Sequence, residues 1–300
     1  MKRISDRHTF YEFHESNQPV LTIESGEAVE FETMDCLSNV LEEMGKNLYE
    51  TAFDKDKVNP ATGPVYIKDA MPGDVLEIKI EDIRFKEQAV ITCQTGYGLI
   101  GDYFDKTTYR ITPISEGHLQ FDEKLRIPLD PMVGVLGTTP KGDAVPTGLL
   151  GTFGANMDNT MMRKGATLFL PVYVEGALAA VGDVHAAMGD GEINCSAIEA
   201  PAFVTLRFKV RKDLSIEHPI LMDDNYFTTI ASEATLDQAV EVSVRSMANI
   251  LKERLACPFD DISMLMSAVG HAQICQAVNT LKTARYLMPL YVLTTYGFSF

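Results

Sequence analysis

Short strand-like runs broken by turn residues are the feature that most constrains how this chain can fold. In residues 75–83 the apolar side chains share one face and the charged side chains share the other: Leu76, Ile78 and Ile80 against Glu77 and Lys79. A period of two residues is typical of a half-buried antiparallel strand. Residues 28–31 form a shorter run of the same kind. The first third of the chain is therefore predicted to be β-rich.

Two further β-type runs follow in the second half of the chain. Residues 167–174 (TLFLPVYV) are nearly apolar throughout, which predicts a strand buried on both faces. Residues 203–210 (FVTLRFKV) are rich in β-branched and aromatic side chains, and they predict another strand.

Helical periodicity is confined to a few segments. In residues 235–255 the apolar side chains of Val240, Val244, Met247 and Leu251 fall at helical spacing. A second short helix is expected after a cap formed by Asp260 and Asp261, and an early helix is expected over residues 37–48. The chain is therefore predicted to be α+β and β-rich, with a helical C-terminal part.

Residues 128–152 carry many proline and glycine residues and no periodicity, so an ordered loop is expected there. This tract suggests a β-rich N-terminal lobe over residues 1–150. A second lobe over residues 151–300 would hold the candidate site and the C-terminal helices. A single continuous domain fits the same pattern.

Composition excludes several classes of protein. The 42 acidic and 26 basic residues give a formal net charge of -16, whereas nucleic-acid binders need a clustered cationic face. The sequence has no signal-type apolar segment and no run long enough to span a membrane, so a cytoplasmic location is expected. The five cysteines are odd in number and lack a Cys-x-x-Cys pair, which argues against a disulfide framework or a zinc ribbon.

Oxygen and imidazole donors gather between residues 151 and 199. They are Asn156, Asp158, Asp183, His185, Asp190 and Glu192. On a strand, Asp183 and His185 would point to the same face and reach one cation. Gly189 and Gly191 permit a tight turn that brings Glu192 back toward them. This pattern indicates a metal site that supports hydrolysis.

Each of these residues also has a structural interpretation. The Gly-Asp-Gly sequence fits a hairpin turn, Asp183 could cap a backbone group, and His185 could be a hydrogen-bonded core histidine. Asn156 and Asp158 fit an Asx-turn. Asp35 lies between a predicted strand and a predicted helix, where an N-cap or an inward-facing ligand is expected.

Two other motifs suggest different chemistry. Gly96, Gly98 and Gly101 form a Gly-x-Gly-x-x-Gly, but no helical period follows, so a glycine-rich hairpin is predicted instead of a dinucleotide site. Cys195 follows Glu192 closely, and with Lys164 as partner it would form a rival nucleophilic arrangement. No Gly-x-Ser-x-Gly elbow is present.

Taken together, the sequence resembles the acetamidase/formamidase family over most of its length. The strongest matches are NPATGPVYIKDAMPGDVLEIKI, GANMDN and KGATLFLPVYVEGALAAVGDVHAAMGDGEINCSAIE, and weaker ones are IPLDPMVGVLG and SMLMSAVGHAQICQAVNTLKTARYLMP. The resemblance implies a β-sandwich core, a bound divalent metal, hydrolysis of short aliphatic amides such as formamide and acetamide, and a homo-oligomer, often a dimer. The positions that match the family's acidic and histidine residues are Asp35, Asp158, Asp183, His185 and Glu192.

The resulting hypothesis is a metal-dependent amidohydrolase. Asp158, Asp183 and His185 would hold the metal with Asp35 as an additional ligand, Glu192 would be the general base, and Asn156 would donate to the oxyanion. Zinc is favoured by the histidine, with calcium or magnesium as alternatives. Two rival functions are an amidase that depends on Cys195 and a catalytically silent, metal-binding β-rich protein.

Overall fold

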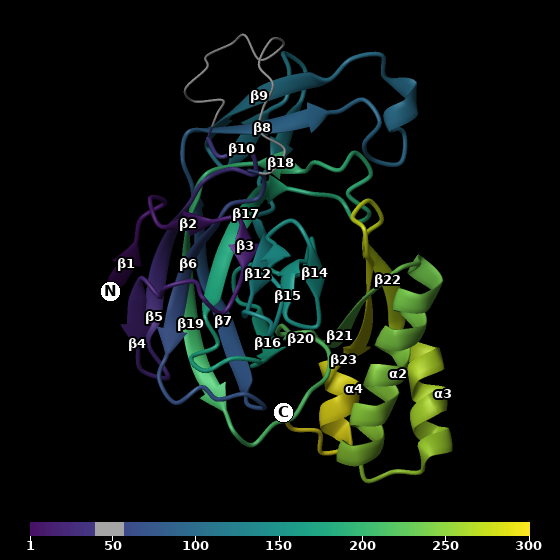
Figure 1. The fold of residues 1–300 in the computed structure, drawn as a ribbon. Coiled ribbons are helices and arrows are strands. Elements are labelled where there is room, and N and C mark those ends of the chain that lie inside the picture. The colour runs from purple at the N-terminus through teal and green to yellow at the C-terminus, as the bar shows by residue number, and fades with distance from the viewer. Residues whose placement is uncertain (40–56) are drawn as a thin grey trace.

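A computed structural model describes residues 1–39 and 57–300 of the chain, and β-strands dominate it (Figure 1). This confirms the predicted β-rich α+β class. One sheet has the strand order β1 (Lys2–Ile4), β5 (Ala28–Thr33), β19 (Ala202–Arg211), β7 (Val75–Phe85), β16 (Thr167–Pro171), β20 (Ile220–Met222), β21 (Tyr226–Glu233), β23 (Lys282–Pro289) and β22 (His271–Gln276).

The second sheet carries most of the candidate site. Its strand order is β11 (Arg126–Pro128), β10 (His118–Gln120), β9 (Thr108–Ser115), β8 (Gln88–Cys93), β18 (Ile198–Glu199), β17 (Ala179–Ala187), β12 (Met132–Gly137), β15 (Gly154–Asn156) and β14 (Leu150–Gly151). Off this path, β6 (Ala61–Ile67) pairs with β17, β2 (Thr9–Phe10) and β4 (Leu21–Ile23), while β13 (Val145–Pro146) pairs with β3 (Glu12–Phe13).

The main core lies between these two sheets. Buried apolar side chains of β5, β7, β16 and β19 pack against those of β6, β12 and β17 in one cluster. Phe31, Ile78 and Phe208 come from the first sheet, and Val65 and Val184 come from the second. The two inner faces therefore form the sandwich that the family resemblance implied.

Strands from both halves of the chain alternate within each sheet. In the first sheet β19 lies between β5 and β7, and in the second sheet β17 lies between β18 and β12 while also pairing with β6. Each sheet is therefore built from both the 1–150 and the 151–300 parts of the chain.

The predicted strands are present, but one prediction was wrong. Strands β5, β7, β16 and β19 cover most of the predicted runs. Residues 128–152, predicted as loop, contain β12, in which all six residues from Met132 to Gly137 are buried between β15 and β17. Because both faces of β12 are covered, its sequence MVGVLG shows no alternation of apolar and polar residues, and the signal for a strand is lost.

The C-terminal helices cover the part of the first sheet formed by β20 to β23 (Figure 1). They are α2 (Leu236–Arg254), α3 (Phe259–Val269) and α4 (Leu290–Thr295), and a short 3-10 helix, η1, spans Gly101–Tyr103. None of the helices in the described residues is long and apolar enough to cross a bilayer.

The predicted C-terminal helices are confirmed, with two differences. Helix α2 buries Ala239, Ser243, Met247 and Leu251. Met247 and Leu251 are the predicted residues, whereas near the start of the helix Ala239 and Ser243 are buried instead of the predicted Val240 and Val244, each one position later. Pro258, and not the aspartates, stands at the N-cap of α3, while Asp260 and Asp261 lie in its first turn. Acidic side chains are favourable there because the helix N-terminus carries partial positive charge. Beyond Asn39, the helix predicted over residues 37–48 falls outside the described residues.

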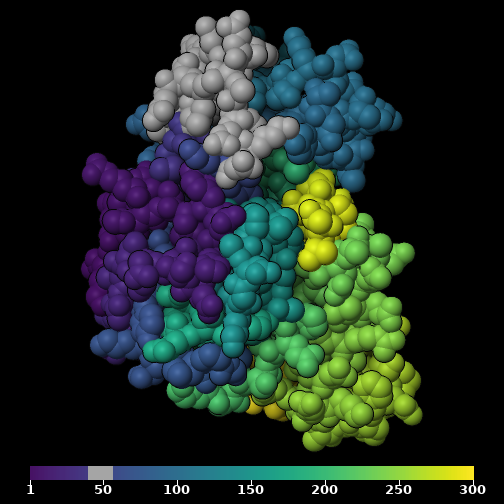
Figure 2. All heavy atoms as spheres, in the orientation of Figure 1, coloured from purple at the N-terminus to yellow at the C-terminus, as the bar shows by residue number. Residues whose placement is uncertain are grey.

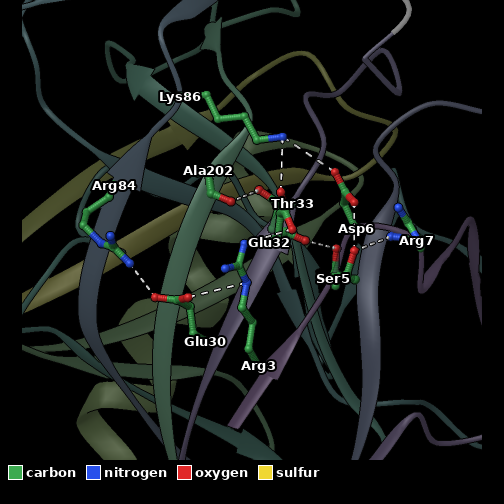
Figure 3. Close-up of polar contacts among 11 residues, drawn as sticks. Arg3, Ser5, Asp6, Arg7, Glu30, Glu32, Thr33, Arg84, Lys86 and Ala202 are labelled. Carbon is green, nitrogen blue, oxygen red and sulfur yellow. Dashed lines mark hydrogen bonds and ion pairs between the residues drawn. The ribbon is translucent and has the colours of Figure 1, made fainter. Parts of the chain in front are cut away.

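Charged residues line β1, β5 and the end of β7 on the outer side of the sandwich (Figure 3). Glu30 on β5 pairs with Arg84 and lies 3.6 Å from Arg3, while Lys86 lies 3.4 Å from Glu32. Ion pairs that remain partly open to solvent contribute little individually. They leave the opposite faces of β5 and β7 free to bury their apolar side chains.

Candidate active site

Four adjoining strands of the second sheet bring the acidic and histidine side chains together. Strand β17 carries Asp183 and His185, and its pairing with β18 places Glu199 directly opposite His185. On the other side, β12 pairs with β15, which ends at Asn156 just before Asp158. Residues up to 43 positions apart in sequence, such as Asn156 and Glu199, thus reach one region through strand pairing.

His185 lies at the centre of this region. Its Nε2 atom is 3.1 Å from Glu199 Oε2 and 3.4 Å from Asp183 Oδ1. Its Nδ1 atom lies 3.1 Å from the sulfur of Met132 on β12. The imidazole is fully buried, so the two carboxylates form the polar environment of Nε2. The prediction that Asp183 and His185 reach the same place is confirmed.

Asp158 faces the same region from the loop that follows β15. Its Oδ2 atom accepts a hydrogen bond from Asn279 Nδ2 at 2.9 Å. Asn279 follows β22, and in Figure 2 a yellow patch of the C-terminal part lies beside the teal surface of the middle of the chain. The C-terminal segment therefore fixes one oxygen of Asp158 and leaves the other available.

Glu192 belongs to the turn after β17. Gly191 forms an isolated bridge with Gln276, and its backbone N–H donates to Cys275 O at 2.8 Å. Potential ligand atoms of Asp158, His185 and Glu192 lie within 4.8 Å of one another. The turn thus carries the Glu192 carboxylate back toward the strand, as predicted.

A second donor group adjoins the first. Potential ligand atoms of Cys36, Asp183 and Glu199 also lie within 4.8 Å of one another. The two groups meet at His185, whose Nε2 atom is close to both Asp183 and Glu199.

Gly134 on β12 lies against two carboxylates of the site. A Cβ atom at position 134 would lie 2.7 Å from Asp183 Oδ2 and 2.8 Å from Asp158 Oδ1. Contacts that short do not occur in folded proteins, so glycine is required where two carboxylates approach the backbone.

Burial changes the acidity of the site. Burial and the nearby Asp183 raise the pKa of Asp158 to about 6, and burial raises the pKa of Glu199 to about 7. Burial and Asp158 raise the pKa of Glu192 well above its ordinary value. Burial lowers the pKa of His185, but Glu199 and Asp183 outweigh it and raise that pKa well above its ordinary value. The site therefore resists carrying uncompensated negative charge.

Several buried polar atoms here have no hydrogen-bond partner among the described residues. They are Asp158 Oδ1, His185 Nε2, Glu199 Oε2 and Asn156 Oδ1. His185 Nε2 and Glu199 Oε2 lie 3.1 Å apart but do not meet the geometric criteria for a hydrogen bond. Since buried polar groups are almost always paired, these atoms point to a cation or ligand that they would contact.

The backbone is strained at three of the acidic residues. Asp158, Asp183 and Glu192 have φ values of 45°, 51° and 45°, in the left-handed region that favours glycine. Strain of this kind persists where the surrounding structure enforces it, and it concentrates at functional sites.

A cavity of about 200 Å³ opens onto part of this site. Asp183, Glu192 and Glu199 line it together with Asn156, Asn279 and Tyr97. Within the described part of the chain, neither lysine nor arginine is among its lining residues. The cavity thus offers carboxylates and neutral hydrogen-bonding groups to a small molecule.

Some predicted residues lie outside the donor groups. Asp35 is buried, and its Oδ1 atom accepts from the backbone N–H groups of Leu37 and Asn39 at 2.9 Å, the capping role considered beside the ligand role. Asp190 bonds to Thr160 at 2.8 Å and pairs with Arg285 at 2.7 Å. These two carboxylates therefore make hydrogen bonds and an ion pair beside the donor groups and belong to neither group.

The structure disfavours the arrangement built on Cys195. Lys164 forms an ion pair with Asp82 at 2.8 Å, and its side chain is 68% exposed, so it does not assist the half-buried thiol of Cys195. Burial and the neighbouring Glu192 raise the pKa of Cys195 to about 12. A nucleophilic cysteine requires a lowered pKa instead.

Glu199, Cys36 and Asn279 were missed by the sequence analysis. Glu199 lies seven residues beyond Glu192, and Asn279 is 121 residues from Asp158, its hydrogen-bond partner. No local spacing links these residues, because strand pairing and the C-terminal fold bring them together. The glycine-rich segment at residues 96–101 was predicted correctly: it joins the antiparallel strands β8 and β9.

Comparison with known proteins agrees with this architecture. The model of the acetamidase/formamidase family matches residues 2–148 and 150–266. The chain belongs to the acetamidase/formamidase family. This confirms the resemblance inferred from the sequence motifs.

Solved structures of family members are similar over the whole chain. An acetamidase from Bacillus halodurans is 40% identical, with a TM-score of 0.95 over 99% of this chain and 100% of that one. A predicted acetamidase/formamidase from Thermoanaerobacter tengcongensis is 39% identical, with a TM-score of 0.96 over 100% and 99% of the two chains.

Among curated relatives, a putative formamidase from Schizosaccharomyces pombe is 23% identical over 267 residues, 67% of this chain. The match spans 64% of that relative, which is less than two thirds of its length.

Proposed function

We propose that this member of the acetamidase/formamidase family is a metal-dependent amidohydrolase that cleaves short aliphatic amides to a carboxylate and ammonia. The observation that carries the proposal is the set of buried, unpartnered donor atoms on Asp158, His185 and Glu199. The names of its relatives, acetamidase and formamidase, support the same reaction class.

The donor set fits a divalent cation. Asp158 and His185 would hold it, with Asp183, 3.4 Å from the imidazole, as a further ligand. Mixed imidazole and carboxylate ligands favour zinc, while calcium and magnesium prefer oxygen alone. When bound, such a cation would polarise the amide carbonyl and lower the pKa of water.

Glu192 is the proposed general base. It lines the cavity, and burial raises its pKa well above the ordinary value of a carboxyl group, which makes its carboxylate a stronger base. It would accept a proton from the attacking water and deliver it to the departing ammonia. One water is consumed for each amide bond broken.

Asn156 is placed to orient the substrate. Its Nδ2 atom donates to Gly148 O at 3.3 Å, and its side chain lines the cavity. An amide nitrogen has two hydrogens, so the second is available to the carbonyl oxygen of a bound amide. The cavity volume of about 200 Å³ favours short substrates.

Ammonia release from formamide, acetamide and propionamide, measured with and without prior chelation, tests the proposal. We expect release that chelation abolishes and added metal restores. His185→Ala should lose both metal and activity, whereas His218→Ala, in the loop before β20, should retain both. Full metal content and activity in His185→Ala would contradict the proposed ligands, and turnover unaffected by chelation would contradict metal dependence.

The remaining parts of the proposal concern location and assembly. We also propose that this enzyme of small amides is cytoplasmic and that it assembles as a homodimer or a higher homo-oligomer. Light scattering coupled to size-exclusion chromatography would measure the assembly, and a mass of about one chain would contradict it.

A further inference from the structure

The proposed amidohydrolase leaves Cys36 and Glu199 without a role. Cys36, Asp183 and Glu199 place a thiol and two carboxylates within 4.8 Å of one another. From this arrangement, and resting on the proposed function, we propose that the site holds two cations, the second bound by Cys36, Asp183 and Glu199 beside the first at Asp158 and His185. Asp183 has two oxygens and can serve both.

The two donor groups are built alike. Glu199 Oε1 accepts a hydrogen bond from the backbone N–H of Ala197 at 2.8 Å, while its Oε2 atom has no hydrogen-bond partner in the described part of the chain. Asp158 is held through Oδ2 by Asn279, while its Oδ1 atom is unpartnered. The two residues are 2% and 1% exposed. Each group therefore contains a fixed carboxylate with one buried oxygen left for a ligand.

Charge balance favours two ions over one. The two donor groups contain four carboxylates, on Asp158, Asp183, Glu192 and Glu199. The described lining residues supply no lysine or arginine to offset them. With a Cys36 thiolate these groups carry five negative charges. One divalent ion would leave three of them uncompensated in a buried site, whereas two divalent ions would leave one.

The thiol of Cys36 defines the chemistry of the second ion. A metal-bound cysteine is a thiolate, so binding would release the thiol proton to solvent. Thiolate ligands select zinc and other transition metals and disfavour calcium and magnesium. The second position is therefore expected to take zinc, or cobalt(II) as a spectroscopic substitute.

Metal analysis and cobalt(II) titration of the purified full-length chain test this inference. We expect two equivalents of metal for each chain. Filling the second position with cobalt(II) should produce a near-ultraviolet absorption band from thiolate-to-cobalt charge transfer. Cys36→Ser should lose that band and about one equivalent of metal, and Glu199→Gln should weaken binding of the same equivalent.

Cys195→Ser is the matched control, because Cys195 lines the same cavity but belongs to neither donor group. It should keep the band and both equivalents. A circular dichroism spectrum like that of the unaltered chain, together with retention of the other equivalent of metal, would establish that Cys36→Ser is folded. If Cys36→Ser unfolds, the band and stoichiometry of the unaltered chain still decide the question.

The outcomes separate the two proposals. One equivalent of metal without a thiolate band overturns the second position and leaves the proposed function intact. One equivalent that disappears in Cys36→Ser overturns the two-ion arrangement, because the donors then form a single site. No bound metal overturns both.

Discussion

The guanidinium of Arg285 joins the two loops that flank the site: its Nη2 atom donates to Asp190 Oδ2 at 2.7 Å, and its Nη1 atom donates to Asn159 Oδ1 at 2.7 Å. Asp190 lies two residues before Glu192, and Asn159 directly follows Asp158. Arg285 is 4% exposed, so the guanidinium end of both bonds is shielded from water, although the Asp190 side chain is 41% exposed.

Arg285→Lys should therefore disturb the site without removing any proposed ligand. A lysine cannot present two parallel donor edges, so we expect a loss of about 10- to 100-fold in metal affinity or kcat. Metal competition and steady-state kinetics would measure this. Arg245→Lys, on the exposed face of α2, is the control. Equal metal affinity and kcat in Arg285→Lys and the unaltered chain would refute the positioning role.

Gly134 provides a second test, because an added methyl group would collide with two site carboxylates. Gly134→Ala should lower bound metal and activity by at least about tenfold, since displaced ligands weaken a metal site. Gly189→Ala is a matched control, because a Cβ atom at position 189 has no heavy atom within 4 Å. Similar behaviour of the two variants would show that the space at Gly134 is not critical.

Cys195 should be unreactive in the folded protein. Its pKa is raised to about 12 by burial and nearby carboxylates, so about one thiol in ten thousand is ionised at pH 8. Iodoacetamide should modify Cys195 slowly in the folded chain and readily after unfolding, as peptide mass spectrometry would measure. Rapid modification of folded protein with matching loss of activity would revive the thiol mechanism.

The stabilisation of the folded protein by bound metal should increase with pH. In the metal-free protein the raised pKa values of Asp158, about 6, and Glu199, about 7, mean that the folded state holds protons that the unfolded state releases near pH 4. The stabilisation that these two protonated groups contribute is therefore fully present below about pH 4 and is lost as the pH rises through 6 to 7. A cation replaces those protons, so its benefit is largest above pH 7.

We expect metal at a concentration a hundredfold above its Kd at pH 8 to raise Tm by about 5 °C at that pH. The same metal concentration should raise Tm by less at pH 5. Differential scanning calorimetry at both values would measure the difference. Asp158→Asn should flatten this pH dependence. A metal-induced rise in Tm that is equal at pH 5 and pH 8 would contradict the assignment of these carboxylates.

The sequence predicted what depends on local patterns. Alternation of side chains identified β7, and the spacing of Asp183 and His185 on β17 indicated a shared face. Strand β12 was missed because complete burial removes alternation. The partner of His185 across the strands, Glu199, could not be found by spacing, because its position depends on the register between β17 and β18.

The left-handed backbone at Asp158, Asp183 and Glu192 has an evolutionary consequence. Glycine would adopt these conformations with less steric cost than an acidic residue. Selection for thermal stability alone would therefore favour glycine at all three positions and erase the site, while leaving a well-folded sandwich. The acidic side chains at these positions persist against the conformational preference of their own backbone, so a relative that carries glycine there would share the fold without the chemistry proposed for this chain.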